Sequence, residues 1–548
     1  MKRHTSRMKL GLVSFGTILL ISLFSTILMD SRAPQSVWAY GESIHEKLRI
    51  LRMLIDTIQR SYVEERSLEE LMEGAIHGML ERLDPHTNYL PPDNFQRWNK
   101  AFEGFTGIGI YFSMVAGWPM ITGFVENSPA EKSTLQSGDI IEAIDGHSTR
   151  GMTRVEIEEA LMGTPFDAIE LTVLRRQDKI RRQRVRIARS HLNINSIDGA
   201  YMLTDGVGYI SLTRFTGMTA SELDEALEIL TQKGMRALVL DLRDNGGGYL
   251  SAAVAVADRF LPKGTLIVFT KGRLERSFQE YRANGTFPYE KLPVVVLLNH
   301  GTASAAEIVA GALQDWDRAL IVGTTSFGKG LVQSQYRFSD GSALLVTTAK
   351  YYTPLGRCIQ RDYFGMSKDQ YYAAAYLNES PQTSREHATE VFKTPLGRKV
   401  FGGGGIIPDV WADNHSADAA EVVRELYFSA GNVFFDFASR LLRQKPYLRS
   451  YPPQRFASLS ISDDEFQEFE RFLRKNHVDV GMKTLRQHAS DIKFLLKREL
   501  AYLAGGPEAR FWVNYQRDAQ LQAAAGHIFD AELLLQREAV AQVLKQRD

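Results

Sequence analysis

Residues 294–313 read VVVLLNHGTASAAEIVAGAL, and this stretch decides the core of the fold. Its first five residues are valines and leucines, a run that predicts a buried strand. A polar turn containing glycine follows at 299–304, and a helix is expected from Ala305. Ser304 therefore lies where a strand turns into a helix, beside backbone N–H groups and the positive end of the helix dipole. This position suits a nucleophile whose reaction develops an oxyanion.

A second loop of this kind follows the next expected strand, at 319–323. It reads TTSFGKGLVQ (324–333), and Lys329 stands between two glycines. A lysine serves as a base only when neutral, and burial lowers its pKa toward that condition. Serine–lysine pairs are one form of the nucleophile–base arrangement. Ser304 and Lys329 are therefore the candidate catalytic pair, and Gln333 is placed to orient the amine by a hydrogen bond.

A third loop, DLRDNGGG (241–248), follows another expected buried strand. Consecutive glycines allow backbone N–H groups to point at a bound carbonyl oxygen. Gly247 is the expected oxyanion-hole donor beside the N–H of Ala305. A lone serine at a helix start is most often a simple cap, so the prediction rests on the three loops together.

The surrounding sequence suggests how the rest of the chain is organised. Residues 200–410 alternate strands and helices, which predicts an α/β core with mostly parallel strands, among them 266–270 and 343–349. Residues from about 100 to 190 are rich in short strands, and the run from Gly138 to Gly146 resembles a PDZ domain. In that fold a peptide adds a strand to a sheet edge, and loop N–H groups hold its carboxylate. The loop here would be Phe105, Thr106, Gly107, Ile108, Gly109 and Ile110.

Composition excludes several classes of function. The chain has 548 residues, with 65 Lys plus Arg and 65 Asp plus Glu, so no net charge draws it to nucleic acid or anionic membrane. Its one cysteine, Cys358, excludes an internal disulfide and a Cys-rich metal site. No His, Asp or Glu cluster has metal-ligand spacing, so neither a metal nor another cofactor is expected.

The N-terminus is typical of an export signal. Residues 1–9 carry four Lys or Arg residues, and an uncharged, mostly apolar run follows at 10–29. A signal-anchor and a signal cleaved after Val37-Trp38-Ala39 both remain open. In either case the positive end stays inside, and the body of the chain is expected outside the cytoplasm.

Several motifs in order resemble the carboxyl-terminal processing peptidases, or tail-specific proteases. The motifs are GMLERLDPHTNYL (78–90), DLRDNGGG (241–248), GTASAAEIVAGALQD (301–315), FGKGLVQ (327–333), KYYTPLGRCIQ (350–360) and GGGGIIPDV (402–410). The resemblance makes Ser304 the nucleophile, Lys329 the base and Gln333 the orienting residue. Two segments depart from the family pattern. Thr302 and Ala306 replace the first and last serines of the family's serine run, while the middle serine, Ser304, is kept. Gly246 replaces a proline, which loosens the loop of the oxyanion hole.

The resemblance implies a multidomain α+β chain. Its parts would be a signal peptide or signal-anchor (1–40), an N-terminal helical region (41–98), a PDZ-like domain (99–190), an α/β crotonase-like Ser–Lys peptidase core (191–415) and a C-terminal helical region (416–548). The helical tail is expected either to form a homodimer or to act as a lid packed on its own core.

The expected function is an exported serine endopeptidase of the bacterial cell envelope, in the periplasm and tethered to the inner membrane by its N-terminal segment. It would cleave proteins at or near C-terminal tails that the PDZ-like domain captures, with an adaptor lipoprotein as a further expected partner. Three alternatives compete with this interpretation of the site. A phosphate-binding loop at 323–329 lacks the Ser or Thr that would follow Lys329. A Ser-His-Asp triad would use His300 and Asp241. A peptide-binding chaperone or scaffold would keep an inactive core.

Overall fold

The computed structural model describes residues 35–545, apart from residues 116, 126, 177–179, 193–194, 205, 377–380, 387, 389, 415–422, 424–425, 427–432 and 479–480. The basic and apolar segments of the expected export signal lie outside these residues. Among the helices described, none is both long and apolar enough to span a membrane. The chain divides into two units, residues 1–83 and residues 84–548.

Helices make up the described part of the first unit, as the sequence predicts for 42–83. They are α2 (Gln35–Ser61) and α3 (Leu68–Leu80). Ser67 starts α3, because its hydroxyl accepts a hydrogen bond from the Glu70 N–H at 3.1 Å.

The second unit begins with a short strand and a helix and continues into a β-rich module. The elements are β1 (Asn88–Leu90), α4 (Pro92–Glu103), β2 (Phe105–Gly107), β3 (Ile110–Val115), β4 (Trp118–Phe124), β5 (Ile140–Ile144), β6 (His147–Ser148), α5 (Arg154–Leu161), β7 (Ala168–Arg176), β8 (Ile180–Ala188) and β9 (Ser190–Leu192). Strands β3-β4-β5-β7-β8 form an antiparallel sheet, and β2 pairs with β9 at the chain's entry and exit. Ile121, Ile141 and Leu171 fill its core.

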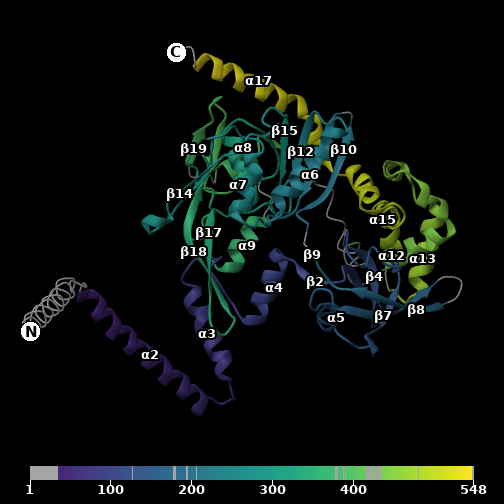
Figure 1. Cartoon of the computed structure of the whole chain (residues 1–548), viewed down its shortest axis with the longest axis horizontal. Coiled ribbons are helices and arrows are strands. Elements are labelled where there is room, and N and C mark those ends of the chain that lie inside the picture. Colours follow the sequence, from purple (N-terminus) through teal and green to yellow (C-terminus); the bar gives the residue numbers. More distant parts are fainter. Residues whose placement is uncertain are drawn as a thin grey trace, which may run out of the picture. The chain divides into compact units, whose positions relative to one another are not determined.

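The α/β core is built on one mostly parallel sheet in the order β10-β11-β12-β15-β16-β21. Figure 1 labels β10, β12 and β15 of this sheet. Its elements are β10 (Ile197–Thr204), β11 (Val207–Leu212), α6 (Thr219–Gln232), β12 (Ala237–Asp241), α7 (Leu250–Asp258), β15 (Val294–Leu298), α8 (Ala305–Asp315), β16 (Leu320–Gly323) and β21 (Val410–Trp411). All residues of β12, β15 and β16 are buried, which matches the apolar runs in the sequence. The carboxyl ends of β12, β15 and β16 lead into the three loops of the predicted site.

Two of the predicted core strands lie elsewhere, and this corrects the sequence analysis. Residues 266–270 and 343–349 fall in β13 (Leu266–Lys271) and β18 (Ala343–Tyr352), which pair antiparallel with each other. They form a second sheet, β1-β18-β13-β14, with β14 (Gln279–Arg282) at its edge and β17 (Leu331–Arg337) paired to β18. Strand propensity alone does not specify a partner, and hairpin pairing of β17 with β18 set this sheet apart.

Both faces of the central sheet are covered. Helices α6, α7 and α8 pack on the face that carries Leu238, Leu240 and Val296. On the other face, Val239 and Val295 contact residues of the last helices, including Leu521. Alternate residues of one strand point to opposite faces, so each face has its own apolar layer.

The remaining elements include a segment predicted to be irregular, at 365–395, and the C-terminal helices. The elements are η1 (Glu275–Ser277), α9 (Lys368–Tyr376), α10 (Pro381–Glu386), β19 (Glu390–Lys393), β20 (Lys399–Gly402), α12 (Val433–Gln444), η2 (Pro446–Ser450), η3 (Pro453–Ser458), α13 (Asp463–Lys475), α14 (Met482–Gln487), α15 (Ala489–Tyr515), α16 (Ala519–Gly526) and α17 (Ile528–Lys545). The C-terminal region is helical, as predicted, and α16 packs on the chain's own core.

Candidate active site

Ser304 lies at the turn between β15 and α8, where the sequence places it. Its backbone has φ 57° and ψ −116°, a conformation that residues other than glycine rarely adopt. Such strain persists only where surrounding bonds hold it, and it is common at functional sites. Here the Ser304 N–H donates to the Glu307 carboxylate at 2.8 Å. The strained turn presents the Ser304 side chain at the start of α8.

Glu307 joins the serine turn, residues 299–304, to the lysine loop, residues 324–330. Its carboxylate is fully buried and accepts from the N–H groups of Ser304, Gly328 and Lys329 at 2.8, 2.7 and 2.9 Å. The Ser326 hydroxyl donates to it at 2.6 Å. Burial raises the pKa of Glu307, while these hydrogen bonds act in the opposite direction. One side chain thus fixes both segments of the candidate pair.

The same contacts bear on the phosphate-binding alternative. In a phosphate-binding loop, backbone N–H groups converge on the ligand, and a helix follows the lysine. Here the N–H groups of Gly328 and Lys329 converge on Glu307, and strand β17 follows. A protein carboxylate therefore occupies the anion-binding position of this loop.

Gln333 holds the Lys329 side chain by a hydrogen bond. The Lys329 ammonium donates to Gln333 Oε1 at 2.8 Å, and Gln333 Nε2 donates to the His86 carbonyl oxygen at 2.6 Å. Burial lowers the pKa of Lys329, whereas the charges of Asp84 and Glu307 raise it. A lysine with a lowered pKa is better suited to act as a base near neutral pH.

The backbones of Ser304 and Lys329 also meet at Tyr351. The Tyr351 hydroxyl lies 3.0 Å from the Ser304 carbonyl oxygen and 2.5 Å from the Lys329 carbonyl oxygen. In the part of the chain that the structure describes, no hydrogen bond joins Ser304 Oγ to Lys329 Nζ. Catalytic hydrogen bonds are often long without substrate and tighten in the complex. The two residues are thus brought together, with their direct bond unmade.

The two predicted oxyanion donors, the N–H groups of Gly247 and Ala305, lie on neighbouring segments. A Cβ at Gly247, which has φ 97°, would stand 2.7 Å from Ser304 Cβ and 2.9 Å from the Ala305 nitrogen. The Gly247 loop therefore packs directly against the serine turn. The Gly247 N–H, however, donates to Asn245 Oδ1 at 2.9 Å. This N–H would have to exchange its acceptor in order to bind an oxyanion.

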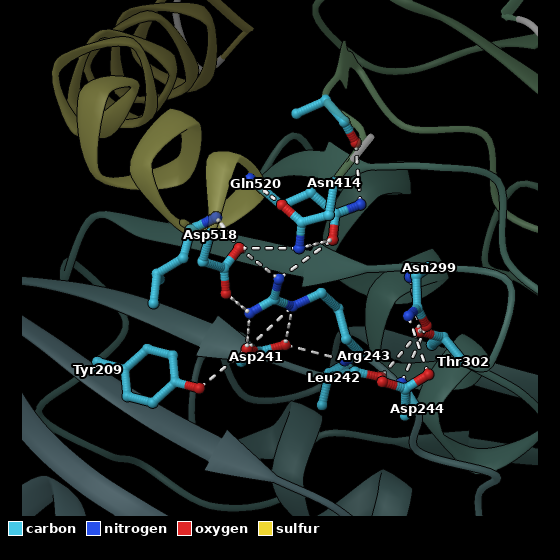
Figure 2. Close-up of polar contacts among 12 residues, drawn as sticks. Tyr209, Asp241, Leu242, Arg243, Asp244, Asn299, Thr302, Asn414, Asp518 and Gln520 are labelled. Atoms are coloured by element: carbon cyan, nitrogen blue, oxygen red, sulfur yellow. Dashed lines mark hydrogen bonds and ion pairs between the residues drawn. The ribbon is translucent and has the colours of Figure 1, made fainter. Parts of the chain in front are cut away.

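Asp241, the third member of the alternative triad, has other partners (Figure 2). Its carboxylate accepts from the Tyr209 hydroxyl at 2.9 Å and from the Arg243 guanidinium at 2.7 to 3.1 Å. The Arg243 backbone N–H also donates to it at 3.0 Å. Asp241 thus acts as the counter-ion of an arginine. This geometry does not favour a role for it beside His300.

The predicted peptide-binding loop lines a large cavity. The cavity has a volume of about 1240 Å³, runs beside β3 and α5, and is lined by five of the six predicted residues: Phe105, Gly107, Ile108, Gly109 and Ile110. Thr106 is paired with His191 in the β2–β9 ladder. The Ile108 side chain is buried in the module, which leaves its backbone as the part that can face a ligand.

Sequence reasoning missed several residues that build the site. Glu307 could have been found, because SAAE (304–307) has the spacing of a capping box. His86 provides the carbonyl oxygen that holds Gln333, and its ring lies 3.1 Å from the Tyr371 hydroxyl. Tyr371 comes from α9, in the segment predicted to be irregular. Among the described residues, no group of three or more His, Cys, Asp or Glu side chains could hold a metal ion.

Comparisons with known proteins show which proteins the chain is similar to. "Peptidase family S41" matches residues 206–371, "Activating protease CtpB N-terminal domain" matches 25–93 and "PDZ domain" matches 120–175. A carboxy-terminal-processing protease of Bartonella bacilliformis is 36% identical over 426 residues, which are 76% of this chain and 94% of that protein. A "Probable CtpA-like serine protease" of Staphylococcus epidermidis is 30% identical over 71% of this chain and 79% of that protein.

Among solved structures, the photosystem II D1 C-terminal processing protease is similar. It is 27% identical, with a TM-score of 0.35, and the match covers 66% of this chain and 86% of that chain.

Proposed function

The chain belongs to the carboxy-terminal processing proteases of peptidase family S41, which are serine peptidases with a PDZ domain, and on this premise we propose that Ser304 is its nucleophile and Lys329 its general base. Gln333 orients the lysine amine. The catalytic core is then a Ser–Lys peptidase of the crotonase-like α/β type. It acts on proteins at or near their C-terminal tails.

One observation carries the proposal. A single buried carboxylate, that of Glu307, binds the backbone N–H groups of both Ser304 and Lys329, at 2.8 and 2.9 Å. Because Gln333 binds the Lys329 ammonium at 2.8 Å, the lysine side chain is held as well. An inactive scaffold would have no need of these paired constraints on a serine and a lysine.

The reaction follows from the roles of these groups. Neutral Lys329 takes the Ser304 hydroxyl proton as Oγ attacks the carbonyl carbon of the scissile peptide bond. The tetrahedral intermediate collapses, the C–N bond breaks, and Lys329 gives the proton to the leaving amine. Water, deprotonated by the same lysine, then attacks the acyl-enzyme ester. The bond between the acyl carbon and Ser304 Oγ breaks, Lys329 returns the proton to Oγ, and the acid product leaves.

The oxyanion is bound by the N–H groups of Ala305 and Gly247. The Ala305 N–H stands at the first turn of α8, where the helix dipole also favours negative charge. The Gly247 N–H contributes after it leaves Asn245 Oδ1, to which it donates in this structure. The site thus becomes competent when the Gly247 N–H exchanges its acceptor and the hydrogen bond between Ser304 and Lys329 forms.

The substrate tail enters through the PDZ domain. The cavity between β3 and α5 accommodates an extended peptide beside a strand, and the 105–110 loop holds its terminal carboxylate. Protein substrates with exposed, mainly apolar tails are the expected ligands.

The setting of this activity is the bacterial cell envelope. The basic residues at 1–9 and the apolar run at 10–29 direct export to the periplasm and tether the protein to the inner membrane. An adaptor lipoprotein that delivers substrates and a homodimer formed through the C-terminal helical region belong to the same proposal.

The test is cleavage of an unfolded protein that ends in an apolar tail, followed by intact-mass spectrometry. Wild type should shorten the substrate, and S304A and K329A should leave it whole. The matched control is S334A, because Ser334 lies on β17 and its hydroxyl bonds to Thr348. If S304A cleaves as wild type does, the nucleophile is misassigned. If wild type also leaves every one of several tails whole although it binds the tail peptide, the inactive scaffold is the better description.

A further inference from the structure

Arg243 links the oxyanion loop, residues 241–248, to a distant part of the chain. Its guanidinium binds Asp241 on one side and Asp518 on the other, and Figure 2 shows it between the two carboxylates. Nη1 and Nη2 donate to the two oxygens of Asp518, each at 2.8 Å, and Nη1 also donates to Gln520 Oε1 at 3.1 Å. Burial opposes the charge of Arg243, but the two carboxylates raise its pKa well above the usual value. It is a permanent, mostly buried cation between two anions.

The Asp518 end of this link is anchored. Asp518 Oδ1 accepts from the Leu521 N–H at 2.9 Å and so caps α16. Asn414, just past β21, donates to Asp518 at 3.1 Å and accepts from the Gln520 N–H at 3.0 Å. Leu521 is buried against the central sheet. Asp518 is therefore a fixed point of the core and not part of a loose arm.

The Arg243 end leads to the nucleophile within a few residues. Asp244 has φ 56°, and Asn299 holds it by accepting its N–H at 2.9 Å. Asn245 is buried, and its carbonyl oxygen accepts from the Ala303 N–H at 2.9 Å, one residue before Ser304. A shift of Arg243 would thus be passed to Gly247 and to the serine turn.

We propose that Arg243 and Asp518 are positioning residues, through which the C-terminal segment sets the oxyanion loop, residues 241–248, against Ser304. This inference rests on the proposed function, because it concerns the hole in which the tetrahedral intermediate is stabilised. Neither side chain touches the substrate. Their effect is on the rate of the chemical step and not on tail binding.

The experiment compares D518N with a matched variant, D224N, in the full chain. Asp224 also forms a two-bond pair with an arginine, accepting from Nε and Nη2 of Arg259 at 2.9 and 2.7 Å, outside the three loops of the site. D518N should lower kcat about tenfold to a hundredfold with KM within about twofold, since small misplacements of catalytic groups cost this much. D224N should keep the wild-type kcat. A D518N kcat within about twofold of wild type would overturn the inference.

A second readout separates positioning from general damage. A fluorophosphonate adduct on Ser304 places an oxygen in the oxyanion hole, so its rate of formation reports on the hole without the PDZ domain. D518N should slow this labelling about tenfold or more, while the affinity for a tail peptide stays unchanged. Equal labelling rates in D518N and wild type would count against the inference.

Two further outcomes are decided in advance. D518E restores the carboxylate one methylene further out, so its kcat should lie between those of D518N and wild type. If D518N does not fold, D518E decides alone: a lowered kcat with intact peptide binding supports positioning, and a wild-type kcat overturns it. If wild type is not labelled at Ser304, the proposed function fails, and the kcat comparison of D518N with D224N still tests the link.

Discussion

The lysine loop, residues 324–330, and the oxyanion loop, residues 241–248, meet at one serine but are held by different means. The lysine loop wraps its N–H groups around Glu307, which lies 19 to 22 positions away in the chain. The oxyanion loop is held through Arg243 by Asp518, 275 positions away. The first is fixed from inside by a local, fully buried group. The second depends on whether the C-terminal helices are docked, so the two halves of the site should respond to different perturbations.

The largest effect is expected where the local support is removed. E307A leaves the N–H groups of Ser304, Gly328 and Lys329 and the Ser326 hydroxyl without their acceptor. Each buried unsatisfied group costs about 1–3 kcal/mol, so we expect the free energy of unfolding to fall by about 3–5 kcal/mol. Activity should be lost as well. Chemical denaturation measures this. E280A, which removes an exposed pair with Arg282, should change stability by less than about 0.5 kcal/mol. A loss below about 1 kcal/mol in E307A would show that the lysine loop has other support.

The next effect concerns the contact of the oxyanion loop with the serine turn. G247A places a Cβ 2.7 Å from Ser304 Cβ in a backbone with φ 97°, so the loop must move away. We expect kcat to fall about a hundredfold or more, as when an oxyanion donor is lost. At Gly246 a Cβ would meet nothing within 4 Å. G246A should therefore stay within about threefold of wild type in the same steady-state assay. Similar kcat values for the two variants would remove Gly247 from the oxyanion hole.

A smaller effect appears in the pH profile. Burial lowers the pKa of Lys329, so activity should be absent below this pKa and should rise with pH through a midpoint below the usual lysine value of about 10.4. The charge of Asp84 raises that pKa. D84N should therefore move the rising limb of kcat/KM to lower pH, and a move to higher pH would contradict this sign.

His86 should not obscure that measurement. Burial and the charge of Lys329 lower the pKa of His86 to about 3. It therefore stays neutral across the pH range in which the rising limb of kcat/KM is measured. The control for D84N is E222Q, on α6, and the loss of this carboxylate should leave the midpoint of the limb unchanged.

The smallest effect is expected from His300. The Asp241 carboxylate is bound to Tyr209 and Arg243, so its geometry does not favour Asp241 as the acid that orients His300 in a triad. H300A should keep kcat within about threefold of wild type in the peptide-cleavage assay. A loss of about a thousandfold or more would restore the triad in place of the lysine.

Local sequence was sufficient for the parts of the site that depend on local structure. The buried run at 294–298 and the helix after Ala305 place Ser304 at a strand-to-helix turn, because strand, turn and helix are each encoded by neighbouring residues. The order of strands 237–241, 294–298 and 320–323 in one parallel sheet brings their three loops together.

Contacts between distant residues, and the rotamers of single side chains, could not be predicted in this way. Strands 266–271 and 343–352 looked like core strands, and only their pairing shows a separate antiparallel sheet. The acceptor of the Gly247 N–H is a side chain two residues earlier, whose rotamer no pattern specifies. The contact between Arg243 and Asp518 joins residues that a single sequence gives no reason to pair.

The place of Asp518 in the chain has a consequence for the making of the protein. Synthesis proceeds from the N-terminus, so Ser304 and Lys329 are complete before Asp518 exists. Until α16 docks on the sheet, Arg243 has Asp241 as its partner but lacks the second carboxylate. A newly made chain would therefore carry the proposed nucleophile and base before the second carboxylate is in place against Arg243. Docking of α16 would then be the step that completes the support of the oxyanion loop.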